Sequence, residues 1–149
     1  MKITAHVLAQ RFIGIPEVPG SGDNPQILAM LKLDDPWPQH DEVPWCSAFA
    51  NYVCWLLRLP RSKRLNARSW LDVGAAVELD DARPGFDVVI LDRPPNPESG
   101  HVGFYSGHDA DSVFLLGGNQ GDTVSVRPFS RSRLLGVRRL RDETMANAA

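Results

Sequence analysis

The chain has 149 residues, of which 43% are hydrophobic and 23% are charged, and its formal net charge is −2. This length suits one domain with a substantial core, and the composition is that of an ordinary globular protein. The near-neutral charge gives no reason to expect a nucleic-acid partner, and no apolar stretch of the sequence approaches the roughly 18 residues of a membrane span.

The first half of the chain is predicted to be helical. Apolar residues recur at helical spacing in four segments: residues 4–13, 25–33, 44–57 and 65–73. Asp23 or Asn24 can cap the second helix, with Pro25 at its first position, and Asn66 can cap the fourth. The third helix is apolar on most of its faces, so we expect it to be buried on several sides.

The second half of the chain is predicted to form strands. After residue 84 the pattern changes to period two and to β-branched residues, in segments 86–91, 101–105, 112–116, 123–127 and 134–140. Helices followed by a meander of strands indicate an α+β fold, with N-terminal helices packed on a mostly antiparallel sheet of five to six strands. Residues 1–141 are expected to form the single domain, and residues 142–149 a flexible tail.

Cys46 lies in the first turn of the third helix, where the positive end of the helix dipole favours the nucleophilic thiolate. The alternative is a small core residue, which is the commoner use of a free cysteine. Cys54, the second cysteine of the chain, lies about 12 Å further along the same helix, too far for a disulfide, and is interpreted as core. Two cysteines without a CxxC motif or a nearby histidine pair do not indicate a zinc site.

A thiol nucleophile needs an imidazole base and a polar group that orients it. Of the four histidines only His101 opens a predicted strand, a rigid platform for a base, although it could equally be a half-buried strand residue. The next strand ends in Gly-Gly-Asn-Gln, which is either simple turn chemistry or a source of the orienting amide. Asn119 is the first choice for that amide and Gln120 the alternate.

Four motifs occur in a characteristic order: WCSAF at 45–49, RPGFDVV at 83–89, GHVGFY at 100–105 and GGNQ at 117–120. This ordered set resembles the CHAP and NlpC-like cysteine amidase/peptidase superfamily, papain-like enzymes that cut bacterial peptidoglycan. The resemblance runs over about residues 14–140, and it is strongest to a phage-associated subgroup that carries WCSAF and GGNQGD. Phe86 departs from the commoner Pro-Gly-Asp strand entry, which leaves the register of that strand open.

The resemblance implies a papain-like (NlpC/CHAP) fold and hydrolysis of a peptidoglycan amide bond through a thioester, without metal or cofactor. Cys46 falls on the family's nucleophile, His101 on its base, and the variable third position on or next to Asn119. The backbone N–H of Cys46 is then placed to stabilise the oxyanion. Candidate substrate-binding residues are Asp41, Trp45, Trp70 and Gln120, although the two tryptophans could equally be core aromatics.

Peptidoglycan is the expected partner, and the protein is expected to be a monomer. Because the N-terminus shows no signal-peptide pattern, delivery to the wall, in the periplasm or outside the cell, is expected to need an export or phage partner, as for a bacteriolytic endolysin. The cut bond is left open between the N-acetylmuramoyl–alanine amide and a bond of the stem peptide or cross-bridge. Two alternatives are a non-catalytic wall-binding or phage structural module of the same fold, and a thiol acyltransferase.

Overall fold

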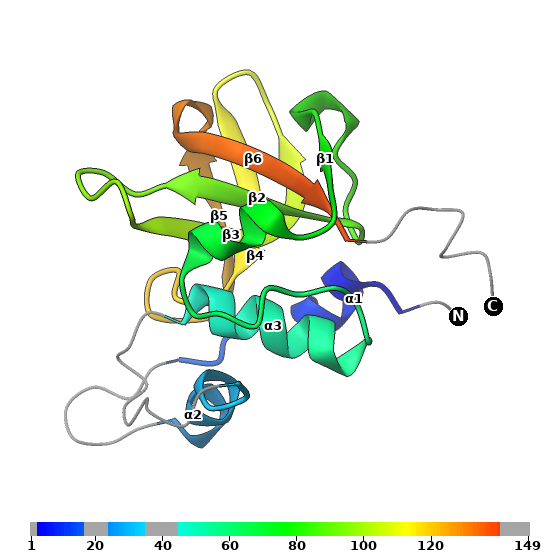
Figure 1. Cartoon of the computed structure of the whole chain (residues 1–149), viewed down its shortest axis with the longest axis vertical. Helices are drawn as coiled ribbons and strands as arrows, with labels where there is room; N and C mark the ends of the chain where they lie inside the picture. Colours follow the sequence, from blue (N-terminus) through cyan, green and yellow to red (C-terminus); the bar gives the residue numbers. More distant parts are fainter. Residues whose placement is uncertain (1–2, 17–23, 35–44, 141–149) are drawn as a thin grey trace.

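Helices cover one side of a curved β-sheet in the computed structural model, which describes residues 3–16, 24–34 and 45–140 (Figure 1). The α-helices are α1 (Ala5–Gln10), α2 (Pro25–Leu31) and α3 (Cys46–Leu56), and the 3₁₀ helices are η1 (Ala67–Asp72), η2 (Leu79–Asp81) and η3 (Arg131–Arg133). α3 lies between α2 and the sheet, in contact with both, which explains why it is apolar on several faces.

The sheet has six strands in the order β1-β6-β2-β3-β4-β5, and every neighbouring pair is antiparallel. Its strands are β1 (Ala75–Val77), β2 (Asp87–Asp92), β3 (Gly100–His108), β4 (Ser112–Gly117), β5 (Ser125–Ser130) and β6 (Leu134–Arg139). The predicted α+β fold with helices on an antiparallel sheet is therefore confirmed. The five predicted strands correspond to β2–β6, whereas β1 was not predicted, because three residues are too few to show a period.

Local capping explains where the first two helices begin. The Thr4 side chain accepts a hydrogen bond from the N–H of Val7 at 3.2 Å, and Asn24, one of the two predicted caps, accepts one from Gln26 at 2.9 Å. Asn66 precedes the predicted fourth helix, but its side chain makes no cap bond, and that helix is a 3₁₀ helix. Side-chain capping therefore fixes α1 and α2, and η1 depends on packing.

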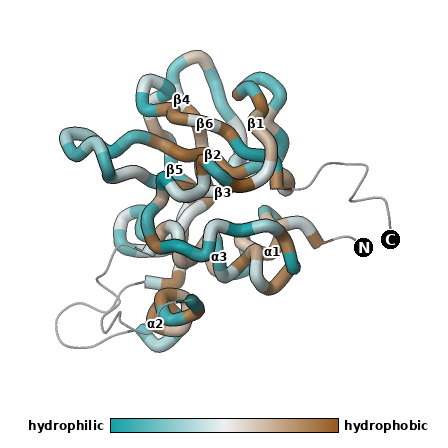
Figure 2. Tube along the Cα trace, in the orientation of Figure 1, coloured by the Kyte–Doolittle hydropathy of each residue, from teal (hydrophilic) through white to brown (hydrophobic). Residues whose placement is uncertain are grey.

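Apolar side chains fill both faces of the sheet, as the alternation along β3 shows. Val102 and Phe104 join the core shared with the helices, whereas Tyr105 joins a second cluster with Leu115 on the opposite face. Hydrophobic segments accordingly run through the centre of the sheet and between the sheet and the helices (Figure 2). By the same alternation His101 belongs to the face away from the helices, so the nucleophile and the base come from different layers.

Asp87 anchors the entry to β2. Its buried carboxylate accepts hydrogen bonds from Arg139 Nε at 2.9 Å, Arg139 Nη2 at 3.0 Å and the N–H of Arg83 at 2.7 Å. Asp87 also faces Arg139 across the β2–β6 ladder, so Phe86 does not displace the strand. The register that the sequence left open is thus defined by an ion pair.

Replacing Asp87 with alanine is expected to lower the free energy of unfolding by about 3–5 kcal/mol, because it removes the buried partner of a charged side chain. Urea denaturation followed by circular dichroism measures this change. Glu98→Ala is the matched control, since the Glu98 side chain is exposed, and it should stay within about 0.5 kcal/mol of the wild type. Equal stabilities of the two variants would show that the ion pair contributes nothing.

Candidate active site

Cys46 is the first residue of α3, directly after Trp45, which occupies the N-cap position without a side-chain cap bond. The first N–H groups of a helix have no partner within it, so here they are directed at the Cys46 region. Cys46 is only 3% exposed, and the backbone N–H groups of Ser47 and Val102 act to lower the pKa of its thiol. The start of α3 is therefore a polar environment for a thiolate within an apolar core.

His101 lies at the beginning of β3, opposite Leu91 of β2, and its side chain interacts with the Cys46 thiol. The imidazole is 5% exposed and packs on the ring of Phe129, with ring centroids 5.1 Å apart and an interplanar angle of 33°. The structure thus brings together the predicted nucleophile and base from a helix and a strand that are distant in sequence.

Gln120 holds the other side of the imidazole. Its Nε2 donates to the carbonyl oxygens of Leu115 at 3.0 Å and Ser125 at 2.8 Å, which uses both amide hydrogens. Its Oε1 therefore accepts from His101 Nε2, at 2.8 Å. An imidazole that carries its proton on Nε2 when neutral leaves Nδ1 as the atom available to Cys46.

The pKa of Cys46 reflects opposing influences. Burial would raise the pKa of this thiol, but the charge of His101, its hydrogen bond and the N–H groups of Val102 and Ser47 together lower it below its usual value. Cys54 has no such surroundings: burial raises the pKa of its thiol to about 12, although the charge of Arg61 opposes this. Only Cys46 is thus placed to be a thiolate near neutral pH.

The pKa of His101 shifts in the opposite direction. Burial would lower it, but the Cys46 thiolate, a hydrogen bond to Cys46 and the hydrogen bond to Gln120 raise it above the usual value, against a smaller effect of Arg93. A lowered thiol pKa beside a raised imidazole pKa favours a thiolate–imidazolium pair. Such a pair is the resting form of an activated thiol nucleophile.

Asn119, the first choice for the orienting amide, does not contact the imidazole in this structure; Gln120, the alternate, does. Asn119 has φ 58, a left-handed conformation that asparagine tolerates, and its place is in the turn after β4. Gly117 makes room for the neighbouring amide, since a Cβ there would lie 2.5 Å from Gln120 Oε1. The sequence placed Gly-Gly before both amides, and only the structure shows that the space at Gly117 is used by Gln120.

The two tryptophans are core residues, which corrects their interpretation as cleft residues. Trp45 and Trp70 are both 0% exposed, so neither can contact a substrate. A Cβ on Gly118 would lie 2.6 Å from the Trp45 ring, and Trp70 Nε1 donates to the hydroxyl of Ser47 at 2.9 Å. Both side chains instead stabilise the start of α3, Trp45 by packing and Trp70 by its hydrogen bond to Ser47. Asp41 lies outside the described residues.

The imidazole borders a pocket of about 420 Å³ on the face away from the helices. It is lined by the imidazole, the turn after β4 and side chains that the sequence analysis missed: Arg93, Arg127, Pro128, Phe129 and Arg133. The sequence signal for them was weak, because they come from a loop, from β5 and from the 3₁₀ turn after it, with no common spacing.

The structure describes residues 3–16, 24–34 and 45–140. In that part of the chain no three His, Cys, Asp or Glu side chains cluster as metal ligands would. No helix there is both long and apolar enough to cross a bilayer.

Iodoacetamide at about pH 7 is expected to alkylate Cys46 at least about 10³-fold faster than Cys54, because a thiol of pKa about 12 is almost wholly protonated there. In His101→Ala the midpoint of the Cys46 rate–pH profile should move to higher pH, since burial then dominates the pKa of Cys46. Mass spectrometry of the labelled peptides measures both. Faster labelling of Cys54, or an unmoved midpoint, would contradict the assignment of the pair.

Comparison with known proteins shows the fold. No protein-family model and no curated protein sequence matches the chain. Among solved structures, it is similar to NlpC1 from Trichomonas vaginalis, with a TM-score of 0.59 and 20% identity, over 91% of this chain and 42% of that one. The chain thus spans less than half the length of that protein. Its α+β fold is NlpC-like.

Proposed function

We propose that this chain is a cysteine hydrolase that cleaves an amide bond of peptidoglycan through a thioester intermediate. The observation that carries the proposal is the Cys46–His101 pair, with Gln120 holding the imidazole at 2.8 Å. The NlpC-like fold and the ordered motifs support peptidoglycan as the substrate, since proteins of that superfamily cut it.

In the proposed mechanism the Cys46 thiolate attacks the amide carbonyl carbon. The imidazolium of His101 gives its proton to the leaving amine as the C–N bond breaks, which leaves an acyl group on the sulfur. Neutral His101 then takes a proton from water, whose oxygen attacks the thioester, and the carboxylic acid leaves while the thiolate–imidazolium pair is restored. Gln120 acts as a positioning residue, because it touches His101 and not the reacting atoms.

The start of α3 is proposed to stabilise the oxyanion of both tetrahedral intermediates. Phe49 is the residue whose N–H closes the first turn, on the carbonyl of Trp45 at 2.9 Å, so the preceding N–H groups are not used by the helix itself. The backbone N–H of Cys46 is the donor that we assign to the oxyanion, next to the attacking sulfur.

Digestion of purified peptidoglycan tests the proposal and identifies the bond. Mass spectrometry of the soluble fragments distinguishes release of whole stem peptides, which indicates the N-acetylmuramoyl–alanine amide, from release of peptide pieces, which indicates a bond within the stem or cross-bridge. The expected result is one new amino group for each cut, with no change in the glycan.

The alternatives give different outcomes in the same digestion. A wall-binding or structural module would sediment with peptidoglycan without releasing fragments. A thiol acyltransferase would release fragments only when an acceptor amine is supplied. Action on the wall after delivery by a phage or export partner, as a bacteriolytic endolysin acts, is part of the proposal and is tested by lysis of cells from outside and from within.

A further inference from the structure

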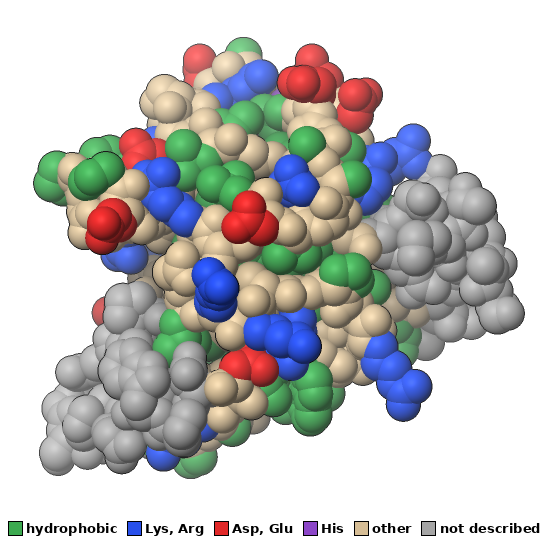
Figure 3. Space-filling view, in the orientation of Figure 1, with side chains coloured by type: hydrophobic (Ala, Val, Ile, Leu, Met, Phe, Trp, Pro, Cys, Tyr) green, Lys and Arg blue, Asp and Glu red, His purple; other side chains and the backbone are tan. Residues whose placement is uncertain are grey.

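The pocket beside His101 has an unusual charge. Three of its lining side chains are arginines, Arg93, Arg127 and Arg133, and none of the lining residues that the structure describes is acidic. Figure 3 shows Lys or Arg and Asp or Glu side chains interspersed over the described part of one face of the molecule. The three arginines therefore give this pocket a local concentration of positive charge.

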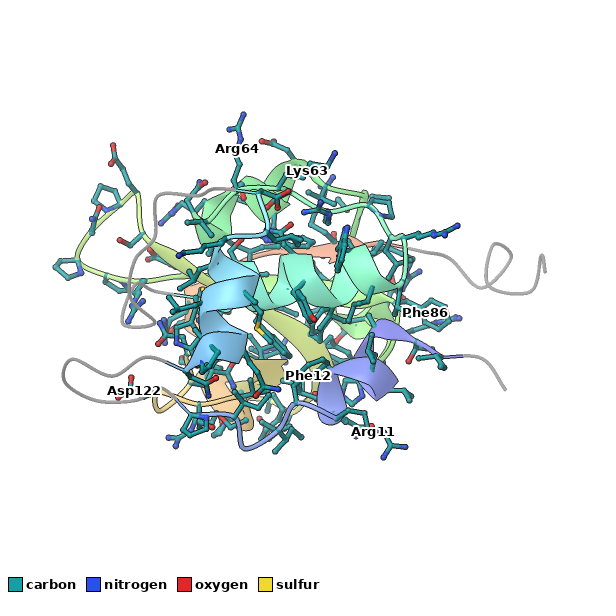
Figure 4. All side chains as sticks on the ribbon, turned by 90° about the horizontal axis from the view of Figure 1, so that it is seen from below. Arg11, Phe12, Lys63, Arg64, Phe86 and Asp122 are labelled. Atoms are coloured by element: carbon teal, nitrogen blue, oxygen red, sulfur yellow. The ribbon has the colours of Figure 1, made fainter. Side chains whose placement is uncertain are left out.

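Among the described residues no acidic side chain forms an ion pair with these arginines. The side chains of Arg93 and Arg127 are both exposed. Arg133 donates its Nε to the carbonyl of Asp92 at 2.9 Å and lies 5.4 Å from the centre of the Phe129 ring, which fixes its direction. Asp122, next to the pocket turn in sequence, does not line the pocket and points outward (Figure 4).

The turn after β4 leaves room for the Arg127 side chain. A Cβ on Gly121 would lie 2.4 Å from Arg127 Nη2, so the glycine lets the guanidinium lie across the turn, and φ +66 at Gly121 favours glycine in any case. Asn119 adds a half-buried amide at the rim, which can donate to an oxygen. Planar guanidinium groups with an amide are well suited to bind a carboxylate.

We propose that this pocket is a subsite for a substrate carboxylate, so that the enzyme prefers amides that carry a free carboxyl group near the scissile bond. The inference rests on the proposed function for its direction, because peptidoglycan stem peptides carry carboxylates. Arg93 also lies close enough to the imidazole for its positive charge to oppose protonation of His101.

Thiol alkylation tests the subsite without requiring turnover. Iodoacetate carries a carboxylate and iodoacetamide does not, so the ratio of their alkylation rates at Cys46 reports attraction of a carboxylate. A change in the thiolate population alters both rates equally and therefore leaves the ratio unchanged. In Arg93→Gln/Arg127→Gln this ratio is expected to fall about five-fold, in line with the loss of two exposed charge contacts. Arg11→Gln is the control, because Arg11 is exposed and extends away from the body in Figure 4.

A second experiment compares the cleavage of muropeptides that have free carboxyl groups with cleavage of the same muropeptides after those groups are amidated. The wild type is expected to cleave the free form about five-fold faster in kcat/KM, and the double arginine variant to cleave both forms equally. An unchanged alkylation ratio in the double variant would overturn the subsite, even if the wall is digested. A fall in the ratio without any hydrolysis would keep the subsite and overturn the proposed function instead.

Discussion

Replacing Cys46 with alanine is expected to lower the rate of amide hydrolysis by about 10⁵- to 10⁶-fold, because removal of a nucleophile eliminates the whole covalent pathway. The fold should persist, since alanine suits the start of a helix and the two flanking positions, Trp45 and Ser47, keep their packing and hydrogen bonds. The measurement is release of new amino groups from purified peptidoglycan, with circular dichroism to confirm folding.

Cys54→Ala is the matched control for this substitution. Cys54 is 0% exposed and lies on the same helix, so the variant is expected to lose stability by about 1–2 kcal/mol through a small cavity. Its activity for each folded molecule should equal that of the wild type. Comparable losses of activity in the two cysteine variants would mean that a general effect on α3, and not the nucleophile, is being measured.

Replacing Gln120 with alanine is expected to lower kcat about 10²-fold and the free energy of unfolding by about 2–4 kcal/mol. The first effect follows because the imidazole loses the acceptor that fixes its tautomer and orientation. The second follows because the carbonyl groups of Leu115 and Ser125 lose buried donors. Steady-state kinetics on muropeptides and urea denaturation measure the two effects separately.

The pH profile separates a positioning role from a purely structural one. Because the bond to Gln120 helps to raise the pKa of His101, its loss should move the alkaline limb of kcat/KM to lower pH. Asn119→Gly is the control, since glycine suits the left-handed backbone at that position, and it should leave this limb in place. A shift in Asn119→Gly with none in Gln120→Ala would restore Asn119 as the orienting amide.

Much of the fold was predictable because each half of the sequence has its own period. Helical spacing before Gly74 predicted the layer of helices, and alternation after Phe86 predicted the sheet. The predicted strand at 101–105 falls within β3. The short strand Ala75–Val77 was missed because its pairing with β6 is a tertiary contact, without a local pattern of its own. Asn66 was predicted as a side-chain cap, but η1 is held by packing.

The site was predictable only where local sequence determines chemistry. The start of a helix made Cys46 a candidate and a strand opening made His101 a candidate, and the family resemblance then favoured both. The choice between Asn119 and Gln120 depended on backbone conformation. Asn119 has the left-handed conformation that turns the chain, and the side chain of Gln120, the next residue, reaches His101. The role of the tryptophans was ambiguous because burial is a property of the folded chain. The three arginines of the pocket beside His101 come from three segments that only the fold brings together.

Trapping the acyl-enzyme is the most direct test of Cys46 as the nucleophile. Wild-type protein is mixed with soluble muropeptides, quenched in acid during turnover, digested, and analysed by mass spectrometry. We expect an acyl group of the substrate bound through a thioester to Cys46, and none on Cys54. An acyl group on any other residue, or release of amino groups by Cys46→Ala at the wild-type rate, would contradict it.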